Sequence, residues 1–407
     1  MKESKPWGLI PFFIPHLGCP QICIFCNQHR IAQQSVQELG AKTLESVDSL
    51  MDRAASIKDT IREYVGTQRD EKYWEVAFYG GSFSAIPRAQ QEAFLRPAYE
   101  ALQEGLIDGI RCSTRPDALS AEDIAFLKSY GVTTVEMGVQ SMDDDILAFA
   151  KRGHSAQDVV QAVGRLQQAG ITVGIQILPG LPGETWQTLV KTAVAVSQLK
   201  PDFVRIYPVL VIDNTDLADM YRAGTYQTLS LDTAIQYSAF LKDWMEDHGI
   251  QVIRTGLQAT EELDQGQGLV AGPYEPAMGE LVENERWRQR IEACLEDYGY
   301  SWSPSEYGPL SIIDKNTMTA GDRENLAKDG RSHNHKQFLT RFRRAAKDQH
   351  HKPIIAITYP VHLASKVKGL KKRNERYFKE AYPGFEWQWK SQGSQVVMHI
   401  GKRKFML

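Results

Sequence analysis

The sequence predicts an α/β protein, a partial (βα)₆ TIM-like barrel followed by a smaller C-terminal α+β region. Between about residues 9 and 255, short apolar segments alternate with longer amphipathic ones. Most of the short segments are apolar on both faces, which is typical of parallel strands covered by helices. The alternation ends near Asn284. We therefore expect a core over residues 1–283 and a second, basic region over residues 284–407.

The expected strands are rich in Val, Ile, Phe and Thr, as half-buried or buried strands are. They cover residues 11–16, 75–80, 109–115, 133–140, 172–180 and 202–208, and a seventh strand-like segment covers residues 251–255. Helices are expected between them, over residues 44–64, 90–103, 121–130, 155–169, 184–199 and 232–248. In barrels of this kind the chemistry takes place at the C-terminal ends of the strands.

Composition sets broad limits on the class of protein. The 407 residues include 47 Lys and Arg against 50 Asp and Glu, and 42% are hydrophobic, which is ordinary for a globular protein. The sequence shows neither an apolar run long enough to span a membrane nor a secretory signal, so we expect a cytoplasmic protein with no membrane partner. Three of the five cysteines fall within eight residues, which favours a metal or cluster site over a disulfide framework.

These three cysteines are Cys19, Cys23 and Cys26, spaced C-x₃-C-x₂-C just beyond the first expected strand. Three thiolates on one short loop can bind three irons of a cubane cluster and leave the fourth iron open. A zinc site is the alternative, and it would need a fourth ligand such as His16 or His29.

Two further motifs end the second and third expected strands. Gly80 and Gly81 let the backbone approach a ligand closely, and the alternative is that they form a tight strand–helix turn. Pro116 forces Arg115 into an extended conformation. Arg115 and Asp117 then either contact a ligand or form a structural ion pair across the turn.

In order along residues 9–283, these motifs resemble the radical S-adenosylmethionine (SAM) superfamily, and in particular the branch that contains the catalytic subunit of the Elongator complex and its bacterial relatives. The resemblance extends through residues 135–141 (VEMGVQS), 151–154 (KRGH), 178–185 (LPGLPGET), 256–258 (GLQ) and 272–277 (GPYEPA). The ordered set is more specific than any single motif.

The resemblance implies an enzyme that cleaves SAM reductively at a [4Fe-4S] cluster and so generates a 5′-deoxyadenosyl radical. It implies that Cys19, Cys23 and Cys26 bind the iron and that a reductant such as ferredoxin or flavodoxin supplies the electron. The SAM contacts that it implies are Phe25 with adenine, Gly80 and Gly81 with the amino group, Gln140 with ribose, Arg152 with the carboxylate, and Ser113 and Arg115 at the end of the third strand.

The sequence departs from the patterns of these relatives at three positions, and each departure limits what the resemblance implies. Ser113 stands where many relatives carry Glu, which puts one carboxylate contact to SAM in doubt. Gln176 stands where oxygen-independent coproporphyrinogen oxidases carry Asp, which argues against a porphyrinogen. The Elongator subunit also has an acetyltransferase domain, but Leu263 stands where its pyrophosphate loop requires a basic or amide residue before Gly266. We therefore do not transfer acetyl-CoA chemistry to this chain.

The charge distribution suggests a substrate class. Residues 315–380 contain 17 Lys and Arg and 6 Asp and Glu, whereas the rest of the chain is acidic. Such asymmetry is typical of nucleic-acid binding, so we expect the basic segment to bind RNA, with tRNA as the substrate. The alternatives are a radical SAM enzyme acting on a small metabolite, and a non-catalytic iron–sulfur or zinc protein that binds RNA.

Overall fold

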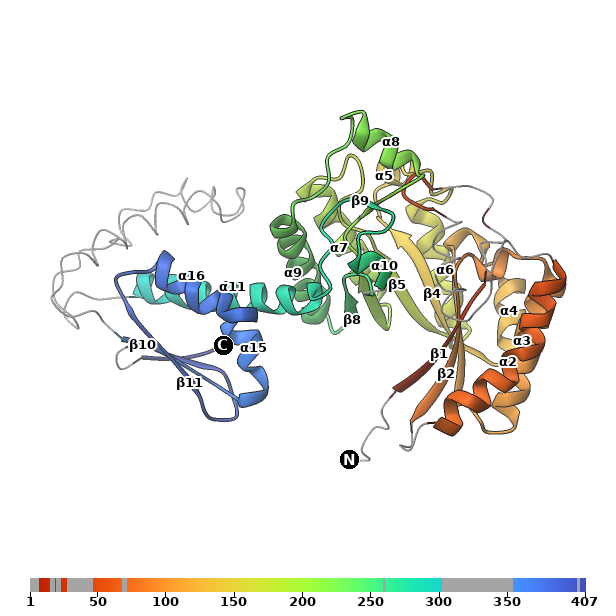
Figure 1. Cartoon of the computed structure of the whole chain (residues 1–407), viewed down its shortest axis with the longest axis horizontal. Helices are drawn as coiled ribbons and strands as arrows, with labels where there is room; N and C mark the ends of the chain where they lie inside the picture. Colours follow the sequence, from red (N-terminus) through yellow and green to blue (C-terminus); the bar gives the residue numbers. More distant parts are fainter. Residues whose placement is uncertain are drawn as a thin grey trace. The chain divides into compact units, whose positions relative to one another are not determined.

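The computed structural model describes residues 7–14, 19, 23–27, 47–67, 72–258, 261–301, 354–400 and 403–407. The chain divides into two compact units, Met1–Pro276 and Ala277–Leu407 (Figure 1).

The first unit is built on a curled sheet of seven parallel strands, and the predicted partial βα barrel is confirmed. The strand order follows the sequence, with the seventh strand at one edge. The strands are β1 (Trp7–Phe13), β2 (Tyr73–Tyr79), β3 (Gly109–Thr114), β4 (Val132–Gln140), β5 (Thr172–Ile177), β6 (Phe203–Ile206) and β8 (Gln251–Thr255). Because all seven are parallel, their carboxyl ends lie along one edge of the sheet.

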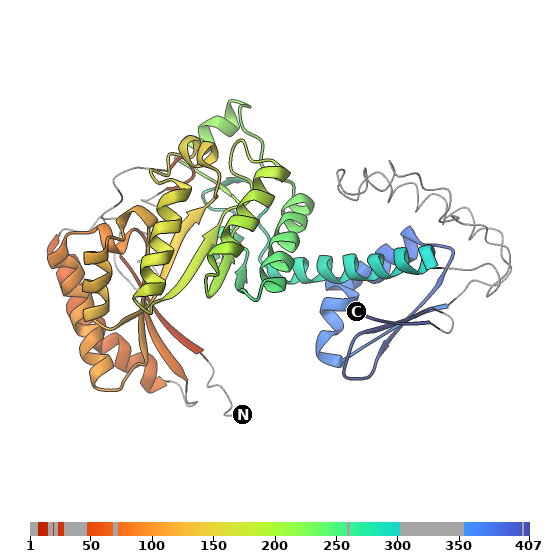
Figure 2. The same ribbon diagram turned by 180° about the vertical axis from the view of Figure 1, so that it is seen from behind.

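Helices pack on the outer face of this sheet, as Figures 1 and 2 show. They are α2 (Val47–Thr67), α3 (Arg88–Gln103), α4 (Ala121–Ser129), α6 (Ala156–Gln168), α7 (Trp186–Leu199) and α9 (Leu231–Asp247). Short helices α5 (Asp144–Phe149), α8 (Asp216–Arg222) and α10 (Glu261–Asp264) and the small antiparallel pair β7 (Val211–Ile212) and β9 (Leu269–Ala271) occupy the connections. The N-cap predicted at Ser120 is present as a capping box with Asp123.

One strand begins earlier than its composition predicts. β1 starts at Trp7, four residues before the expected segment, because it pairs with β2 from Trp7 opposite Tyr73 to Phe13 opposite Tyr79. Pro11 lies inside this pairing, and β1 is an edge strand, where a missing N–H is tolerated. Residues 15 and 16, which were expected to extend the strand, lie outside the described part of the chain.

The strands present apolar side chains to the helices and charged ones to the inner face. Val76, Phe78, Ile110 and Cys112 are fully buried in the core that the helices cover. Because side chains alternate along a strand, the residues between them point to the other face of the sheet.

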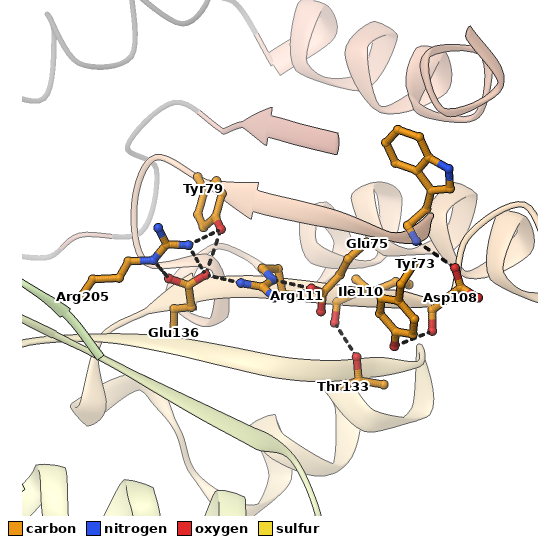
Figure 3. A network of polar contacts seen from close by, with 10 residues as sticks. Tyr73, Glu75, Tyr79, Asp108, Ile110, Arg111, Thr133, Glu136 and Arg205 are labelled. Carbon is orange, nitrogen blue, oxygen red and sulfur yellow. Dashed lines mark hydrogen bonds and ion pairs between the residues drawn. The ribbon is translucent and has the colours of Figure 1, made fainter. Parts of the chain in front are cut away.

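On that inner face, a row of charged and tyrosine side chains crosses the sheet (Figure 3). Arg111 donates to Glu75 on β2 and, through Nη1 at 2.8 Å, to Glu136 on β4. Arg205 on β6 donates to both oxygens of Glu136, at 2.6 and 3.1 Å. Tyr79 donates to Glu136 at 2.8 Å. Burial opposes ionisation of Glu136, but its arginine partners outweigh that effect and lower its pKa.

The second unit is a four-stranded sheet packed against helices, which confirms a smaller C-terminal α+β region. The strand order is β11-β10-β12-β13, in which only β10 and β11 are parallel. Its elements are α11 (Met278–Ser301), β10 (Ile354–Tyr359), α15 (Ala364–Lys368), α16 (Arg373–Ala381), β11 (Glu386–Ser391), β12 (Val397–Ile400) and β13 (Arg403–Met406). Phe378 and Trp387 lie in its core, 4.8 Å apart between ring centroids. None of the described helices in either unit is long and apolar enough to cross a membrane.

The inner-face row makes a prediction about stability. Arg111 is 6% exposed, and replacing it with Leu leaves Glu75 and Glu136 buried beside an apolar side chain. We expect Arg111→Leu to lower the free energy of unfolding by about 3–5 kcal/mol, measured by denaturant titration. As the control, Arg96→Leu removes an exposed ion pair with Glu92 on α3 and should change it by less than about 0.5 kcal/mol. Equal effects of the two substitutions would show that the row does not stabilise the sheet.

Candidate functional site

The cysteine loop lies at the carboxyl edge of the sheet, beyond β1. Cys23 is buried, and its Sγ accepts a hydrogen bond from Arg152 Nη1 at 3.2 Å. The Sγ of Cys19 lies 3.4 Å from Ser82 Oγ, in the loop after β2. The backbone N–H of Cys26 donates to the Cys23 carbonyl at 3.0 Å, which forms a tight turn. The structure thus brings this loop together with the ends of two other βα units.

Backbone hydrogen bonds attach the loop to helices of the same edge. The N–H of Ile24 donates to the Ala150 carbonyl at 3.3 Å, and the Ile24 carbonyl accepts from Leu217 N–H at the start of α8, at 2.8 Å. The Asn27 side chain donates to the Asp213 carbonyl at 2.5 Å. The loop is therefore held on both sides of Cys26.

The three thiols differ in exposure, since Cys23 is buried and Cys19 and Cys26 are partly exposed. Burial, together with the neighbouring Cys23 and Cys19, raises the pKa of Cys26 to about 12, while Arg152 acts in the opposite sense. Three thiolates in this position therefore need compensating positive charge, which iron ions provide when bound.

Gly80 brings the loop after β2 against the end of β1. Its φ is +101°, and a Cβ at this position would lie 2.5 Å from the carbonyl oxygen of Ile14. Only glycine fits, because a side chain would push this loop away from the chain that leads to the cysteines. Next to it, Gly81, Ser82 and Ser113 line a small hollow, and Ser113 Oγ lies 3.4 Å from the Gly81 carbonyl oxygen.

Arg115 and Asp117 form the structural ion pair that the sequence allowed. The pair is bidentate, with Nε and Nη2 of Arg115 at 2.9 and 2.8 Å from the two carboxylate oxygens. Burial alone would lower the pKa of Arg115, but Asp117 outweighs that effect and raises it. The third nitrogen, Nη1, is buried without a partner, so this pair leaves one donor for a ligand.

Several buried polar atoms without hydrogen-bond partners lie around the carboxyl edge of the sheet. Their chemistry tests whether the residues present fit SAM. Besides Arg115 Nη1 they include Gln140 Oε1, Arg152 Nε and His154 Nδ1. Gln140 also has a φ of 73°, in the left-handed region that such residues rarely adopt. Guanidinium nitrogens suit a carboxylate and an amide suits ribose hydroxyls, so these groups match the chemistry of SAM.

His154 lies in this cluster and was not identified as a site residue from the sequence. Its Nε2 lies 3.3 Å from the Val139 carbonyl oxygen, and burial lowers its pKa to about 4, with the nearby Arg152 acting in the same sense. The ring is therefore neutral at physiological pH. In the sequence, its position two residues after Arg152 was the feature that could have identified His154 as a site residue.

The possible metal ligands in the structure can be compared with what an iron–sulfur cluster and a zinc ion each require. Among the described residues, no three His, Cys, Asp or Glu side chains are placed to surround a single metal ion. A cubane does not require such a group, because each thiolate binds a different iron. His16 and His29, the proposed fourth zinc ligands, lie outside the described residues.

The charged inner-face row was also not predicted. Its signal was present in the sequence, because Glu75, Arg111, Glu136 and Arg205 are charged residues inside strands that are otherwise apolar. In a sheet covered by helices on its outer face, such residues mark the inner face.

Comparison with known proteins identifies the class of protein that this fold and edge define. The family model of the radical SAM superfamily matches residues 13–196, and the model of the radical SAM C-terminal domain matches residues 201–288. The chain belongs to the radical SAM superfamily and is an enzyme. The cofactors of this family are a [4Fe-4S] cluster and SAM.

Individual relatives point to the predicted branch. A tRNA uridine(34) acetyltransferase of Methanocaldococcus infernus is 31% identical over 250 residues, which are 54% of this chain and 45% of the relative. An uncharacterized protein of Methanocaldococcus jannaschii is 30% identical over 241 residues, 56% of this chain and 69% of the relative. Elongator complex protein 3 of Homo sapiens is 22% identical over 271 residues, 59% of this chain and 50% of the relative.

A solved structure supports the fold. The archaeal Elp3 of Methanocaldococcus infernus with an N-terminal deletion superposes with a TM-score of 0.52 and 24% identity, over 70% of this chain and 64% of that chain. The resemblance to the acetyltransferases and to the Elongator protein covers only the radical SAM part, and this chain spans half of their length or less.

A carboxyl group with a buried oxygen, in the loop between β5 and α7, leads to a pH-dependent prediction. Glu184 precedes α7 and accepts from Gly180 N–H, while its second oxygen is buried without a partner. Burial raises its pKa to about 8, with the Gly180 hydrogen bond acting in the opposite sense. The folded protein therefore holds this proton up to about pH 8, whereas the unfolded chain loses it near the ordinary glutamate pKa of 4.5.

The contribution of Glu184 to the free energy of unfolding should therefore fall as the pH rises from 4.5 to about 8. We expect Glu184→Gln, which stays neutral, to match the wild-type free energy of unfolding near pH 4 and to exceed it at pH 8 by up to about 4 kcal/mol. Urea titrations across this range measure the difference. Glu63→Gln, at an exposed position of α2, is the control and should show no such trend. A difference that does not vary with pH would contradict the assignment.

Proposed function

We propose that Cys19, Cys23 and Cys26 hold the [4Fe-4S] cluster of this enzyme, within a catalytic core over residues 1–283. The observation that carries the proposal is the placement of the cysteine loop. It lies at the carboxyl edge of the sheet, beside a buried guanidinium and a set of buried polar atoms without partners. Three thiolates, with no fourth protein ligand among the described residues, suit a cluster with one open iron.

When bound, the cluster and SAM supply reductive cleavage of the sulfonium C–S bond, which gives methionine and a 5′-deoxyadenosyl radical that abstracts a hydrogen atom. The chain positions these groups and limits access of water. Gly80 and Gly81 offer backbone to the SAM amino group, Arg152 Nε and Arg115 Nη1 offer donors to the carboxylate, and Gln140 Oε1 accepts from ribose. Phe25 and Ser113 complete the contacts, and a one-electron donor such as ferredoxin or flavodoxin supplies the electron.

This proposal predicts different results for two cysteines. We expect Cys23→Ala to lose the cluster and all cleavage of SAM to 5′-deoxyadenosine with dithionite, because one of three ligands is removed. Cys112→Ala removes a fully buried side chain in β3. It should keep about four irons and four sulfides and lose about 1 kcal/mol of stability. Iron, sulfide and product are assayed on anaerobically purified protein. Zinc without sulfide in the wild type, or equal cluster loss in both variants, would contradict the ligand assignment.

We infer that the substrate of this enzyme is RNA, with tRNA favoured by the names of its relatives. The charge of the C-terminal region of this chain is a second argument for an RNA substrate. Residues 354–407 contain 11 Lys and Arg and 3 Asp and Glu. Residues 302–353, which hold much of the predicted basic segment, lie outside the described residues.

The second unit displays several of these charges on the turn that leads into α16 and on its first residue. Lys371, Lys372 and Arg373 are exposed, and both lysines have positive φ, 49° and 62°. Non-glycine residues in this conformation are costly and persist where surrounding structure holds them.

Two buried asparagines hold the turn. Asn284 on α11 accepts from Leu370 N–H at 2.7 Å and donates to the carbonyls of Ser365 and Lys366, both at 3.1 Å. Asn374 donates to the Asn284 carbonyl at 2.7 Å. The turn is therefore fixed, and its cations form a surface suited to a phosphate backbone. In the metabolite alternative, the basic region would instead serve as a lid or as an oligomer contact.

Salt dependence tests the RNA proposal. Each neutralised phosphate contributes about −0.7 to the slope of log K against log salt for single strands. Replacing Lys371 and Lys372 with Asn, which tolerates positive φ, and Arg373 with Gln should make the slope for unmodified tRNA less steep by about 2.

The matched control removes three charges from the outer helices of the first unit, by Lys200→Asn, Lys128→Gln and Arg96→Gln. Lys200 also has positive φ, 51°. This triple variant should keep the wild-type slope. Binding that does not depend on salt, or equal slopes in both triple variants, would contradict an RNA role for the turn.

A further inference from the structure

Arg152 is a buried cation whose described neighbours include a thiol and no carboxylate. Its side chain is 6% exposed, and Nη1 donates to Cys23 Sγ at 3.2 Å. Within the described residues, no Asp or Glu lies within ion-pairing distance of it. By contrast, Arg111, Arg115 and Arg205 are each paired with a carboxylate. A buried guanidinium without a carboxylate is stable only where other negative charge balances it.

The fold determines where this guanidinium lies. Nη2 donates to the Gly138 carbonyl at the end of β4, and a Cβ on Gly138 would lie 3.2 Å from Nη2. The backbone N–H of Arg152 donates to the Leu147 carbonyl at 2.9 Å, beyond a left-handed Lys151. On another side, the guanidinium lies 6.0 Å from the centroid of the Phe25 ring. Residues from three separate segments of the chain therefore surround the Arg152 guanidinium and hold it against Cys23.

We propose that Arg152 is a positioning residue that tunes the cluster, because its hydrogen bond and charge at Cys23 Sγ raise the reduction potential. This inference rests on the proposed role of Cys23 as an iron ligand. Reduction adds one electron, taken from a one-electron donor that is itself oxidised, and breaks no bond. The added negative charge is stabilised by a fixed cation and by a hydrogen bond to a ligand sulfur.

This role is separate from binding the SAM carboxylate. Arg has five N–H donors, and Nη1 and Nη2 are committed to Cys23 and Gly138, whereas Nε is buried without a partner. Nε is thus the group available to SAM. The effect on potential should be present before SAM binds, and this separates the two roles experimentally.

The test is a redox titration of the anaerobically reconstituted full chain without SAM, followed by electron paramagnetic resonance of the reduced cluster. We expect Arg152→Gln to shift the reduction equilibrium at least tenfold toward the oxidised form, which is 59 mV for a one-electron couple. Arg152→Lys retains charge but not the fork of donors, so a smaller shift in the same direction is expected. The control, Lys151→Asn, removes an exposed charge paired with Asp216 and should shift the equilibrium less than twofold.

An unchanged potential in Arg152→Gln with full iron and sulfide would overturn this inference and leave the cluster assignment intact. A wild-type chain without iron and sulfide would instead overturn the proposed function. A second measurement does not depend on the variants. After exchange into D₂O, pulsed resonance of the wild-type reduced cluster should show a strongly coupled deuteron, and the absence of any such deuteron would also overturn the role of Arg152.

Discussion

All seven strands of the main sheet in the first unit run in one direction, and this constraint determines where chemistry can take place. Parallel strands place every following loop at one edge. Cys23, Gly81, Arg115 and Gln140 belong to four different βα connections or strand ends, yet they meet at that edge because of this single geometric rule. A cofactor as large as SAM needs contacts from several segments, and a parallel sheet supplies them without long excursions of the chain.

The inner-face row of charged and tyrosine side chains also stabilises this edge of the sheet. Tyr79 ends β2 immediately before Gly80, and its hydroxyl is bonded to Glu136 on β4. Glu136 is in turn fixed by Arg111 and Arg205 from β3 and β6. The charges in this row balance, which makes burial of so many ionised groups tolerable. The glycine turn therefore follows a strand whose last side chain, Tyr79, is held by hydrogen bonds with Glu136 on β4 and Arg205 on β6.

Charge balance also distinguishes the site from its surroundings. In the described residues of the first unit, Arg111, Arg115 and Arg205 have carboxylate partners, whereas Arg152 faces Cys23. The contrast shows that the cysteine loop lies in a locally positive environment. The second unit differs, because its cations on the turn before α16 are exposed and a polar scaffold of Asn284 and Asn374 holds the backbone beneath them. Buried cations suit a resident cofactor, and exposed ones suit a large polyanion that binds and leaves.

The sequence by itself determined the class of fold and where along the chain the three closely spaced cysteines lie. Alternating apolar segments report strands and helices because local periodicity follows from backbone geometry, and the C-x₃-C-x₂-C spacing is a local property of one loop. The start of β1 at Trp7 followed from pairing with β2, which is a non-local contact. The left-handed Gln140, the bond from Arg152 to Cys23 and the row from Glu75 to Arg205 also depend on residues brought together by folding. Only the tertiary structure decided these, because hydrogen bonding and charge pairing depend on distance in space, which sequence separation does not report.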